Sequence, residues 1–498
     1  MDLQKTFPYI AKDENGYSTF YVDGKPYWML AGELHNSSAS SAEYMEAEVW
    51  PYLRGMNMNT VLLTVAWEDI EPEEGQYDLS IVGALLEQAR RENMRLVILW
   101  FGLWKNGESF YVPRWVKADT TRFFRACHQN SVASETISPL CREAVEKDKA
   151  AFCQLMGYLA ENDKENTVIM VQVENEVGML GSERDFSPAA EEVFAKEIPA
   201  EVGALFEKSG TWPEAFGERA CEYFMAYHYA NALQVIAAAG KAIWPLPMYV
   251  NAWQDQYPFR PGCYPSGGPV APMSRLWLQQ APAIDFCSPD IYVPYFVKTC
   301  ERYLEAGNTL FVPETYRTAI SASNALYLFS ALEGIGFSPF GIEDMQKAPV
   351  KDGSTPGWQY IADSYRLLAG AQKAILKARA EGRLHAFVKL YPGEWGTVVS
   401  MKNWDVQVDY VEPGEGKGST AGVLIEEEDG FYLIGCNLKF KVVPKLGRRD
   451  IVGLSRMEEG EFVDGQWKRG RVLNGDELAR TSLPDRPLCR YIGVNIHQ

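Results

Sequence analysis

Two apolar runs of this chain end in carboxylates. Residues 168–178 read Val-Ile-Met-Val-Gln-Val-Glu-Asn-Glu-Val-Gly, and residues 309–317 read Thr-Leu-Phe-Val-Pro-Glu-Thr-Tyr-Arg. A carboxylate at the end of a buried strand is costly unless it is paired, neutralised or opens into a cleft. Two such strands predict that Glu176 and Glu314 face each other across one site. A pair of carboxyl groups around one bond is what glycoside hydrolysis requires.

The elements that would position these glutamates recur along roughly the first 350 residues. Short runs rich in Val, Ile and Leu alternate there with amphipathic helical segments, which indicates a parallel sheet covered by helices. Eight such units predict a (β/α)8 TIM barrel with long loops. A doubly wound sheet is the alternative, but the chain has neither a GxGxxG nor a Walker sequence. The predicted strands are 27–31, 60–66, 95–101, 168–173, 247–251, 285–291, 309–313 and 336–340.

The pattern changes after a long helix predicted over about 358–380, which Gly382 follows as a terminator. Beyond this helix, short alternating runs are separated by Asp429-Gly430, Asp464-Gly465 and Asn474-Gly475, which are hairpin turn signals. The sequence therefore predicts two domains. The barrel would span residues 1–383, and a smaller C-terminal β-rich, sandwich-like domain would span residues 384–498.

Composition excludes several classes of function. The net charge of −18 repels phosphate backbones and anionic membranes, so neither nucleic acid nor a membrane is an expected partner. No segment approaches 18 consecutive apolar residues, and the N-terminus lacks a basic-then-apolar signal region. The nine cysteines contain no CxxC pair. We expect a cytoplasmic protein with reduced thiols, compatible with a homo-oligomer.

Two further kinds of chemistry lack their motifs. The five histidines are scattered without HExxH, so no catalytic metal is expected, and no GxSxG elbow indicates a serine hydrolase.

In a (β/α)8 barrel, the residues at the carboxyl ends of the strands line the active site. Glu176 would end the fourth strand and Glu314 the seventh, 138 residues later, so the two would lie nearly opposite in the ring. The alternative is that each carboxylate pairs with an arginine at the barrel mouth. The candidate substrate-binding residues at the strand ends are His35, Trp67, Glu68, Lys105, Asn106, Asn175, Asn251, Trp253, Tyr292, Tyr316 and Glu343.

These candidates could also have ordinary structural roles. His35 could hydrogen-bond a sugar hydroxyl or simply pack against its neighbours. Trp253 and Trp104 could stack on a pyranose ring or fill the core. Lys105 and Asn106 could donate to sugar hydroxyls or belong to a solvated loop.

The fourth strand also poses a geometric problem. In a regular strand, Glu174 and Glu176 share one face and Asn175 points the other way. For Asn175 and Glu176 both to reach a substrate, the strand must bulge or end near Asn175. Glu174 would otherwise be a rival for the role of the acid.

Several segments resemble glycoside hydrolase family 35 β-galactosidases. The sequence around Asn175-Glu176 is similar to the Gln-Ile-Glu-Asn-Glu-Tyr-Gly acid/base motif of that family, and residues 67–78 are similar to its strand-two segment. Residues 99–107 and 113–116 resemble the strand-three region of a bacterial branch that carries an extra β domain. Residues 422–425 and 431–435 resemble the C-terminal domain of that branch, so the resemblance covers most of the chain.

This resemblance implies a retaining exo-glycosidase that hydrolyses terminal β-D-galactosides of an oligosaccharide or glycoside, with neither cofactor nor metal. It implies that Glu176 is the general acid/base and Glu314 the nucleophile. Val177 stands where the family usually has tyrosine, so the chain could belong to a sister family. Its substrate could then be a glucoside, a fucoside or a mannoside. An inactive carbohydrate-binding barrel and a metal-dependent isomerase or aldolase are two rival functions for the same fold.

Overall fold

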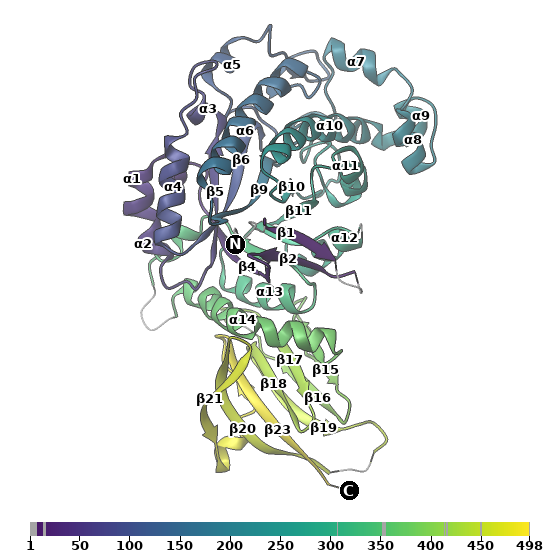
Figure 1. Cartoon of the computed structure of the whole chain (residues 1–498). Helices are drawn as coiled ribbons and strands as arrows, with labels where there is room; N and C mark the ends of the chain where they lie inside the picture. Colours follow the sequence, from purple (N-terminus) through teal and green to yellow (C-terminus); the bar gives the residue numbers. More distant parts are fainter. Residues whose placement is uncertain are drawn as a thin grey trace.

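The computed structural model describes residues 7–12, 16–305, 307–350, 355–412, 414, 417–448 and 451–497. Figure 1 shows a barrel surrounded by helices, followed by a separate layered β structure at the C-terminal end of the chain. The predicted fold class, a TIM barrel followed by a β-rich domain, is confirmed.

Eight parallel strands close into the barrel, and each overlaps one of the predicted strands. Their side chains are almost all buried, because helices cover the outer face and side chains fill the interior. Around the ring the strands are β4 (Met29–Glu33), β5 (Thr60–Ala66), β6 (Arg95–Lys105), β9 (Val168–Asn175), β10 (Met248–Trp253), β11 (Phe286–Ile291), β12 (Phe311–Thr315) and β13 (Gly336–Pro339).

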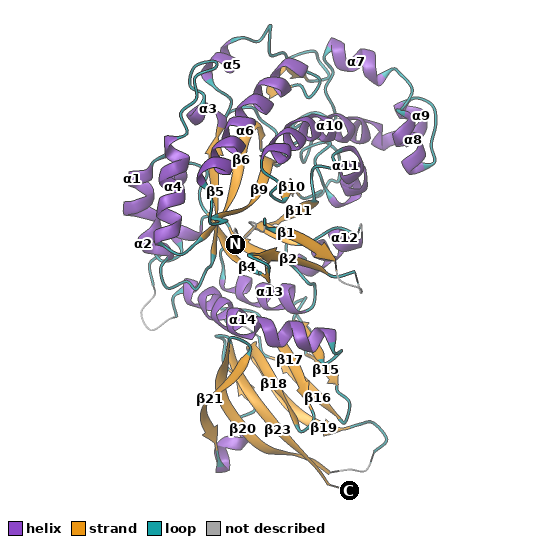
Figure 2. Cartoon of the chain, in the orientation of Figure 1, coloured by secondary structure: helices purple, strands orange, loops and turns teal. Residues whose placement is uncertain are grey.

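Helices alternate with these strands and cover the outside of the barrel (Figure 2). The covering segments are α1 (Ala42–Tyr44), η2 (Met45–Val49), α2 (Trp50–Leu53), α4 (Ser80–Arg91), α6 (Arg142–Asn162), α10 (Ala220–Ile243), α11 (Ser274–Gln280), α12 (Phe296–Glu305), α13 (Ala319–Ser330) and α14 (Gly357–Ala380).

Long connections after β5, β6 and β9 carry further short elements. They are α3 (Trp67–Ile70), α5 (Arg114–Ala118), β7 (Arg125–Cys127), β8 (Ala133–Ile137), α7 (Pro188–Phe194), α8 (Ala200–Phe206) and α9 (Trp212–Phe216). Single helical turns stand at η1 (Ser38–Ser40), η3 (Gly217–Arg219), η4 (Ala271–Met273) and η5 (Ile342–Asp344).

A small antiparallel sheet that the sequence did not predict precedes the barrel. It contains β1 (Tyr9–Lys12), β2 (Ser18–Val22) and β3 (Lys25–Pro26). Phe20 and Val22 pack in one cluster with Met29, Leu62 and Phe311, which stand near the starts of barrel strands. The sheet therefore covers the amino-terminal end of the barrel and leaves the carboxyl ends of the strands for the site.

The C-terminal strands form two antiparallel sheets with a common apolar core that includes Trp404, Phe431 and Ile492. The six-stranded sheet runs β14 (Leu384–Val388), β17 (Ala421–Glu427), β18 (Gly430–Cys436), β23 (Leu488–His497), β20 (Ile451–Val463) and β21 (Gln466–Leu473). The four-stranded sheet runs β15 (Gly396–Ser400), β16 (Trp404–Tyr410), β19 (Leu438–Pro444) and β22 (Ser482–Leu483). Because β14 begins at Leu384, we propose the domain division between residues 383 and 384.

Two of the three predicted hairpin signals lie at hairpins. Asp429-Gly430 stands at the connection of β17 to β18, and Asp464-Gly465 forms the turn of β20 and β21. The prediction of a hairpin at Asn474-Gly475 is wrong. This pair starts the short helix η6 (Gly475–Ala479), in which the Glu477 N–H donates to the Asn474 carbonyl.

Helix α14 joins the two halves of the molecule, as Figure 1 shows. On its barrel side, the Tyr365 hydroxyl reaches the carbonyls of Ala31 and Phe337 at 2.7 and 2.9 Å. On its other side, Asp363 accepts from Arg486 at 2.7 Å, next to β23 in the sequence. The helix therefore holds the β domain at a defined place beside the barrel.

In the part of the chain that the structure describes, every helix is too short or too polar to cross a bilayer. All nine cysteines are unpaired in the structure.

Candidate active site

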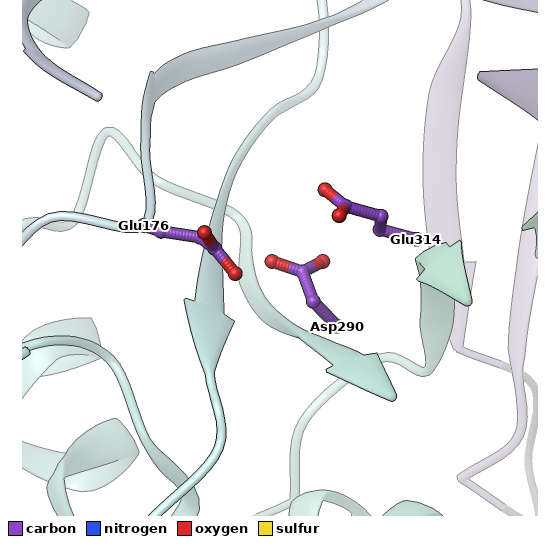
Figure 3. A group of neighbouring side chains, drawn as sticks. All are labelled: Glu176, Asp290 and Glu314. Atoms are coloured by element: carbon purple, nitrogen blue, oxygen red, sulfur yellow. The ribbon is translucent and has the colours of Figure 1, made fainter. Parts of the chain in front are cut away.

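Three carboxylates meet at the carboxyl ends of the barrel strands. Glu176 directly follows β9, Asp290 lies on β11 and Glu314 lies on β12. Figure 3 shows the three side chains converging from these elements, and one carboxylate oxygen of each lies within 4.8 Å of the others. All three residues are buried. The structure therefore brings together the two glutamates that the sequence singled out, and adds an aspartate between them.

The end of β9 is irregular, as the geometric problem at Asn175 required. Glu174 and Glu176 adopt left-handed backbone conformations, with φ of +61° and +42°. The pairing of β9 with β6 shifts register between Trp100 and Lys105. The left-handed conformation costs a residue other than glycine about 1–2 kcal/mol of conformational energy. The surrounding contacts must therefore hold this backbone in place. The irregularity separates the directions of the two glutamates.

The Glu174 carboxylate binds the backbone of β6. It accepts the N–H groups of Leu103 at 3.1 Å and Trp104 at 2.7 Å. Beside it, Asp148 of α6 accepts from the Trp100 indole at 2.8 Å and from Leu103 at 3.0 Å. Burial is the main cause that raises the pKa of both carboxyl groups. Glu174 has no exposed surface, and both of its carboxylate oxygens accept hydrogen bonds from the end of β6.

Asn251 fixes the position of Glu176. Its Oδ1 accepts the Glu176 N–H at 2.9 Å, and its Nδ2 donates to Asp290 Oδ2 at 2.7 Å. Both ends of the amide are used, so Asn251 is a positioning residue. Its direct contact with a substrate stays a prediction.

The Glu176 carboxyl group has a pKa raised to about 7. Burial contributes most, and the negative charge of Glu314 adds to it, while Lys105 and a hydrogen bond with Asp290 oppose the shift. Burial and the charges of Glu314 and Glu176 also raise the pKa of Asp290 well above its usual value. At neutral pH the cluster therefore retains protons that isolated carboxylates would lose.

Glu314 has one oxygen held and one oxygen free. Oε1 accepts the Tyr292 hydroxyl at 2.6 Å, whereas Oε2 is buried and meets no hydrogen-bond partner among the residues that the structure describes. Tyr316 holds Tyr292 in turn. Its hydroxyl donates to the Tyr292 carbonyl at 3.0 Å, and the two rings pack edge to face with their centres 4.9 Å apart. The Glu314 side chain is therefore oriented with one oxygen available for a reacting atom.

Lys105 and Asn175 form the donor side of the site. Lys105 Nζ donates to Asn175 Oδ1 at 2.9 Å and lies 5.1 Å from the Phe101 ring centre. The Asn175 Nδ2 group is buried and finds no acceptor within the described parts of the chain. Both predicted donors thus lie beside the carboxylates, and the amide nitrogen remains available for a substrate hydroxyl.

Two more carboxyl groups extend the acidic cluster at the eighth and first strands. Burial, followed by the charge of Glu314, raises the pKa of Glu33 well above its usual value. Glu343 is buried, and its Oε1 accepts the His35 N–H at 3.0 Å and the Ser38 hydroxyl at 2.8 Å. Glu343 therefore shapes the loop after β4 with one oxygen.

The remaining candidates lie in different surroundings. Trp67 is fully buried and donates its indole N–H to Glu71 at 2.6 Å, and its contact with a substrate stays a prediction. Glu68 pairs with Lys117 at 2.6 Å, and His35 Nε2 lies 2.7 Å from Asp344.

Three further residues considered from the sequence differ in their exposure. Asn106 is exposed and its N–H reaches the Asn175 carbonyl at 3.2 Å. Trp253 ends β10 and is half-buried, whereas Trp104 lies fully in the core.

Residues 19–233 match the family model described as Glycosyl hydrolases family 35. Over this part of the barrel, which is less than half of the chain, the protein is glycoside hydrolase family 35-like. The resemblance is thereby confirmed around Asn175-Glu176 and at residues 67–78, 99–107 and 113–116, whereas Glu314 lies outside the matched range. Residues 361–483, from within α14 to the end of β22, match a domain of unknown function (DUF5597).

Individual relatives align over small parts or at low identity. A β-galactosidase of Xanthomonas manihotis is 30% identical over 82 residues, which are 16% of this chain and 13% of that protein. The chain thus spans only a small part of that relative. A β-galactosidase structure from Bacillus circulans sp. alkalophilus has a TM-score of 0.49 at 9% identity, covering 94% of this chain and 99% of that one. The catalytic domain of β-amylase from Paenibacillus polymyxa has a TM-score of 0.47 at 13% identity. The alignment covers 65% of this chain and 95% of that one.

Three acidic residues of the family 35-like barrel were not chosen as site residues from the sequence. The sequence places Asp290 and Glu33 among the residues at the strand ends, but it gives neither of them a role. Asp148 had a usable signal, because it interrupts the buried stripe of α6 that contains Val145, Ala151 and Phe152. A carboxylate in such a stripe needs a buried partner, which here is the end of β6.

The same three carboxylates are also the candidate set for a metal ion in the described residues, since each offers one ligand atom. A metal requires its carboxylate ligands to be ionised, and binding competes with protons. The raised pKa of Glu176 and Asp290, together with the Lys105 ammonium nearby, weakens such a site. The arrangement is better suited to proton transfer.

Proposed function

We propose that this chain is a retaining exo-acting β-glycosidase that hydrolyses terminal β-D-galactosides. The observation that carries the proposal is the approach of Glu176 and Glu314, whose nearest oxygens lie within 4.8 Å. Carboxyl groups about 5 Å apart suit a double displacement, whereas inverting enzymes need about 6.5–9.5 Å to admit a water. The family 35 match supports the reaction class, and the similarity to the β-galactosidase of Xanthomonas manihotis supports galactose as the sugar.

In the first step, the free Oε2 of Glu314 would attack the anomeric carbon. Tyr292 holds Oε1 at 2.6 Å and thereby aims the other oxygen. The bond from carbon to the leaving oxygen breaks as the bond from carbon to Glu314 forms. Such positioning converts the attack into an intramolecular event.

Glu176 would protonate the leaving oxygen in the same step. A pKa of about 7 keeps a large fraction of this carboxyl group protonated near neutral pH. A proton donor is most effective when its pKa lies close to the working pH. Neither metal nor cofactor has a part in this transfer.

In the second step, Glu176 would accept a proton from water as the water attacks the glycosyl ester. Formation of the ester removes the negative charge of Glu314, which is one of the causes of the high pKa of Glu176. The pKa of Glu176 then falls and favours its role as a base. The same carboxyl group can therefore give a proton in one step and take one in the next.

The donor groups around the carboxylates would bind the sugar hydroxyls. Asn175 offers an amide nitrogen beside Glu176, and Lys105 holds that amide in place at 2.9 Å. A hydroxyl bonded at this point would lie near the reacting carbon. We expect the protein to act in the cytoplasm, and its oligomeric state stays a prediction.

A panel of nitrophenyl β-glycosides tests the proposal. We expect kcat/KM for the galactoside to exceed that for the glucoside, mannoside and fucoside by at least about tenfold, or about 1.4 kcal/mol of transition-state binding. Proton NMR during the first minutes should show the β-anomer of the released sugar. A preference for another sugar would show that the proposed substrate is wrong. Initial release of the α-anomer would exclude double displacement.

A further inference from the structure

A cleft of about 790 Å³ opens between the barrel and the C-terminal domain. One wall comes from the loop after β11 and from α12, and a second comes from the loop after β12 and from α13. The third wall is the segment that follows β14 in the C-terminal domain. Helix α13 contacts β14, β17 and β18 of this domain.

One residue, Tyr292, connects the cleft to the candidate nucleophile Glu314. Tyr292 lines the cleft, and its hydroxyl holds Glu314 at 2.6 Å. Tyr316, which also lines the cleft, donates to the Tyr292 carbonyl at 3.0 Å. A molecule whose end occupies the catalytic centre could therefore continue into this cleft.

The exposed surface of the cleft is aromatic. Tyr295, Tyr316 and Tyr391 expose 40%, 53% and 55% of their area, and they come from three different segments. Leu390 adds a further 40% exposed side chain. A concentration of exposed apolar area marks a binding site more often than an idle surface. The flat faces of exposed tyrosine rings suit the C–H faces of sugar units.

The charges of the cleft balance and indicate a neutral ligand. Lys389 pairs with Glu412 at one end, and Lys298 and Glu301 stand together on α12. Ser321 and Asn324 add uncharged donors and acceptors. An anionic ligand would also be opposed by the net charge of −18.

We propose that this cleft binds the leaving-group side of an extended substrate, a neutral β-linked oligosaccharide that carries the terminal sugar to be removed. This inference rests on the proposed function. An exo-acting enzyme removes the terminal unit, so the rest of the chain can extend only on the leaving-group side. The C-terminal domain then contributes Leu390 and Tyr391 directly to substrate binding.

Calorimetry with the Glu314→Gln chain tests the cleft without turnover. The probes are cellotetraose, xylotetraose, mannotetraose and β-1,4-galactotetraose, each compared with its monosaccharide. At least one tetraose should bind more than about tenfold more tightly than its monosaccharide, and Tyr391→Ala or Tyr295→Ala should weaken that tetraose by about threefold to tenfold. Made instead in the chain that keeps Glu314, both substitutions should leave hydrolysis of the nitrophenyl galactoside at the wild-type rate.

Tyr9→Ala is the matched control, because Tyr9 exposes 41% of its area on β1, at the opposite end of the barrel. This variant should leave tetraose affinity unchanged. The proposal fails if no tetraose gains affinity over its monosaccharide, or if the gain survives in both cleft variants. If no nitrophenyl glycoside is hydrolysed, the proposed function is wrong. The calorimetric result would still decide whether the cleft binds oligosaccharides.

Discussion

Glu174 and Glu176 stand two positions apart, yet their carboxylates have separate partners. Glu174 accepts two backbone N–H groups of β6, whereas Glu176 lies with Asp290 and Glu314. The left-handed backbone at both glutamates separates their directions. The end of β9 therefore supplies Glu174, which holds the neighbouring strand β6, and Glu176, the candidate catalytic acid.

Substitution of these two glutamates should have different consequences. Glu176→Gln should slow substrates with poor leaving groups by several orders of magnitude and dinitrophenyl glycosides much less, because a good leaving group needs little protonation. Glu174→Gln should instead lower the melting temperature, since its oxygens hold the N–H groups of Leu103 and Trp104. Steady-state kinetics over a leaving-group series and thermal melting separate the effects. A leaving-group dependence in Glu174→Gln would move the acid role to that residue.

The rate should fall as the pH rises through neutrality. The pKa of Glu176 is raised to about 7, so the protonated acid is lost above that pH and kcat/KM should drop about tenfold per pH unit. In Glu176→Gln this alkaline limb should be missing for dinitrophenyl substrates. An alkaline limb that persists in Glu176→Gln would assign it to another group.

The same shift predicts a pH-dependent change in stability. The folded pKa of Glu176 lies above its ordinary value of 4.5, so the folded state binds a proton more tightly than the unfolded chain. Stability from this group is full below about pH 4.5 and is lost as the pH rises toward 7. Glu176→Gln should therefore raise the melting temperature at pH 8 relative to wild type, and not at pH 4.5. Equal shifts at the two pH values would contradict the buried, proton-retaining environment.

Removal of the candidate nucleophile should abolish turnover without unfolding the chain. Glu314→Ala should lose several orders of magnitude in kcat, because its free Oε2 is the proposed attacking atom. Azide should restore activity and yield a glycosyl azide of inverted configuration, detectable by NMR. Retention of roughly a tenth of wild-type activity in Glu314→Gln would show that another group attacks.

A chelator should leave the activity unchanged. Although Glu176, Asp290 and Glu314 could offer three ligand oxygens, protons compete with a cation for this cluster. Incubation with EDTA, followed by assay with a nitrophenyl glycoside, measures this directly. Loss of activity that added Mg²⁺ or Mn²⁺ restores would favour a metal-dependent reaction in the same barrel.

Much of the fold could be predicted because its signals are local. Runs rich in Val, Ile and Leu mark β5, β6 and β9, since strands buried on both faces need apolar side chains throughout. The signal is weaker at β13, whose residues Gly336–Pro339 include none of these three types. The N-terminal sheet escaped prediction because β3 has only two residues, Lys25–Pro26, and both are exposed. The extension of β6 to Lys105 was also missed, because it depends on a carboxylate from β9 and one from α6.

The sequence by itself determined that Glu176 and Glu314 would reach one end of the barrel, because parallel strands bring their carboxyl ends to the same edge. It did not determine which way Glu174 and Glu176 point, since that depends on two backbone angles held by distant partners. Only the tertiary structure placed Asp290 between the two glutamates and raised the pKa of Glu176, because burial and charge at a point sum over strands remote in sequence. The cleft beside Tyr292 is likewise tertiary, since its walls come from the barrel loops and from the C-terminal domain.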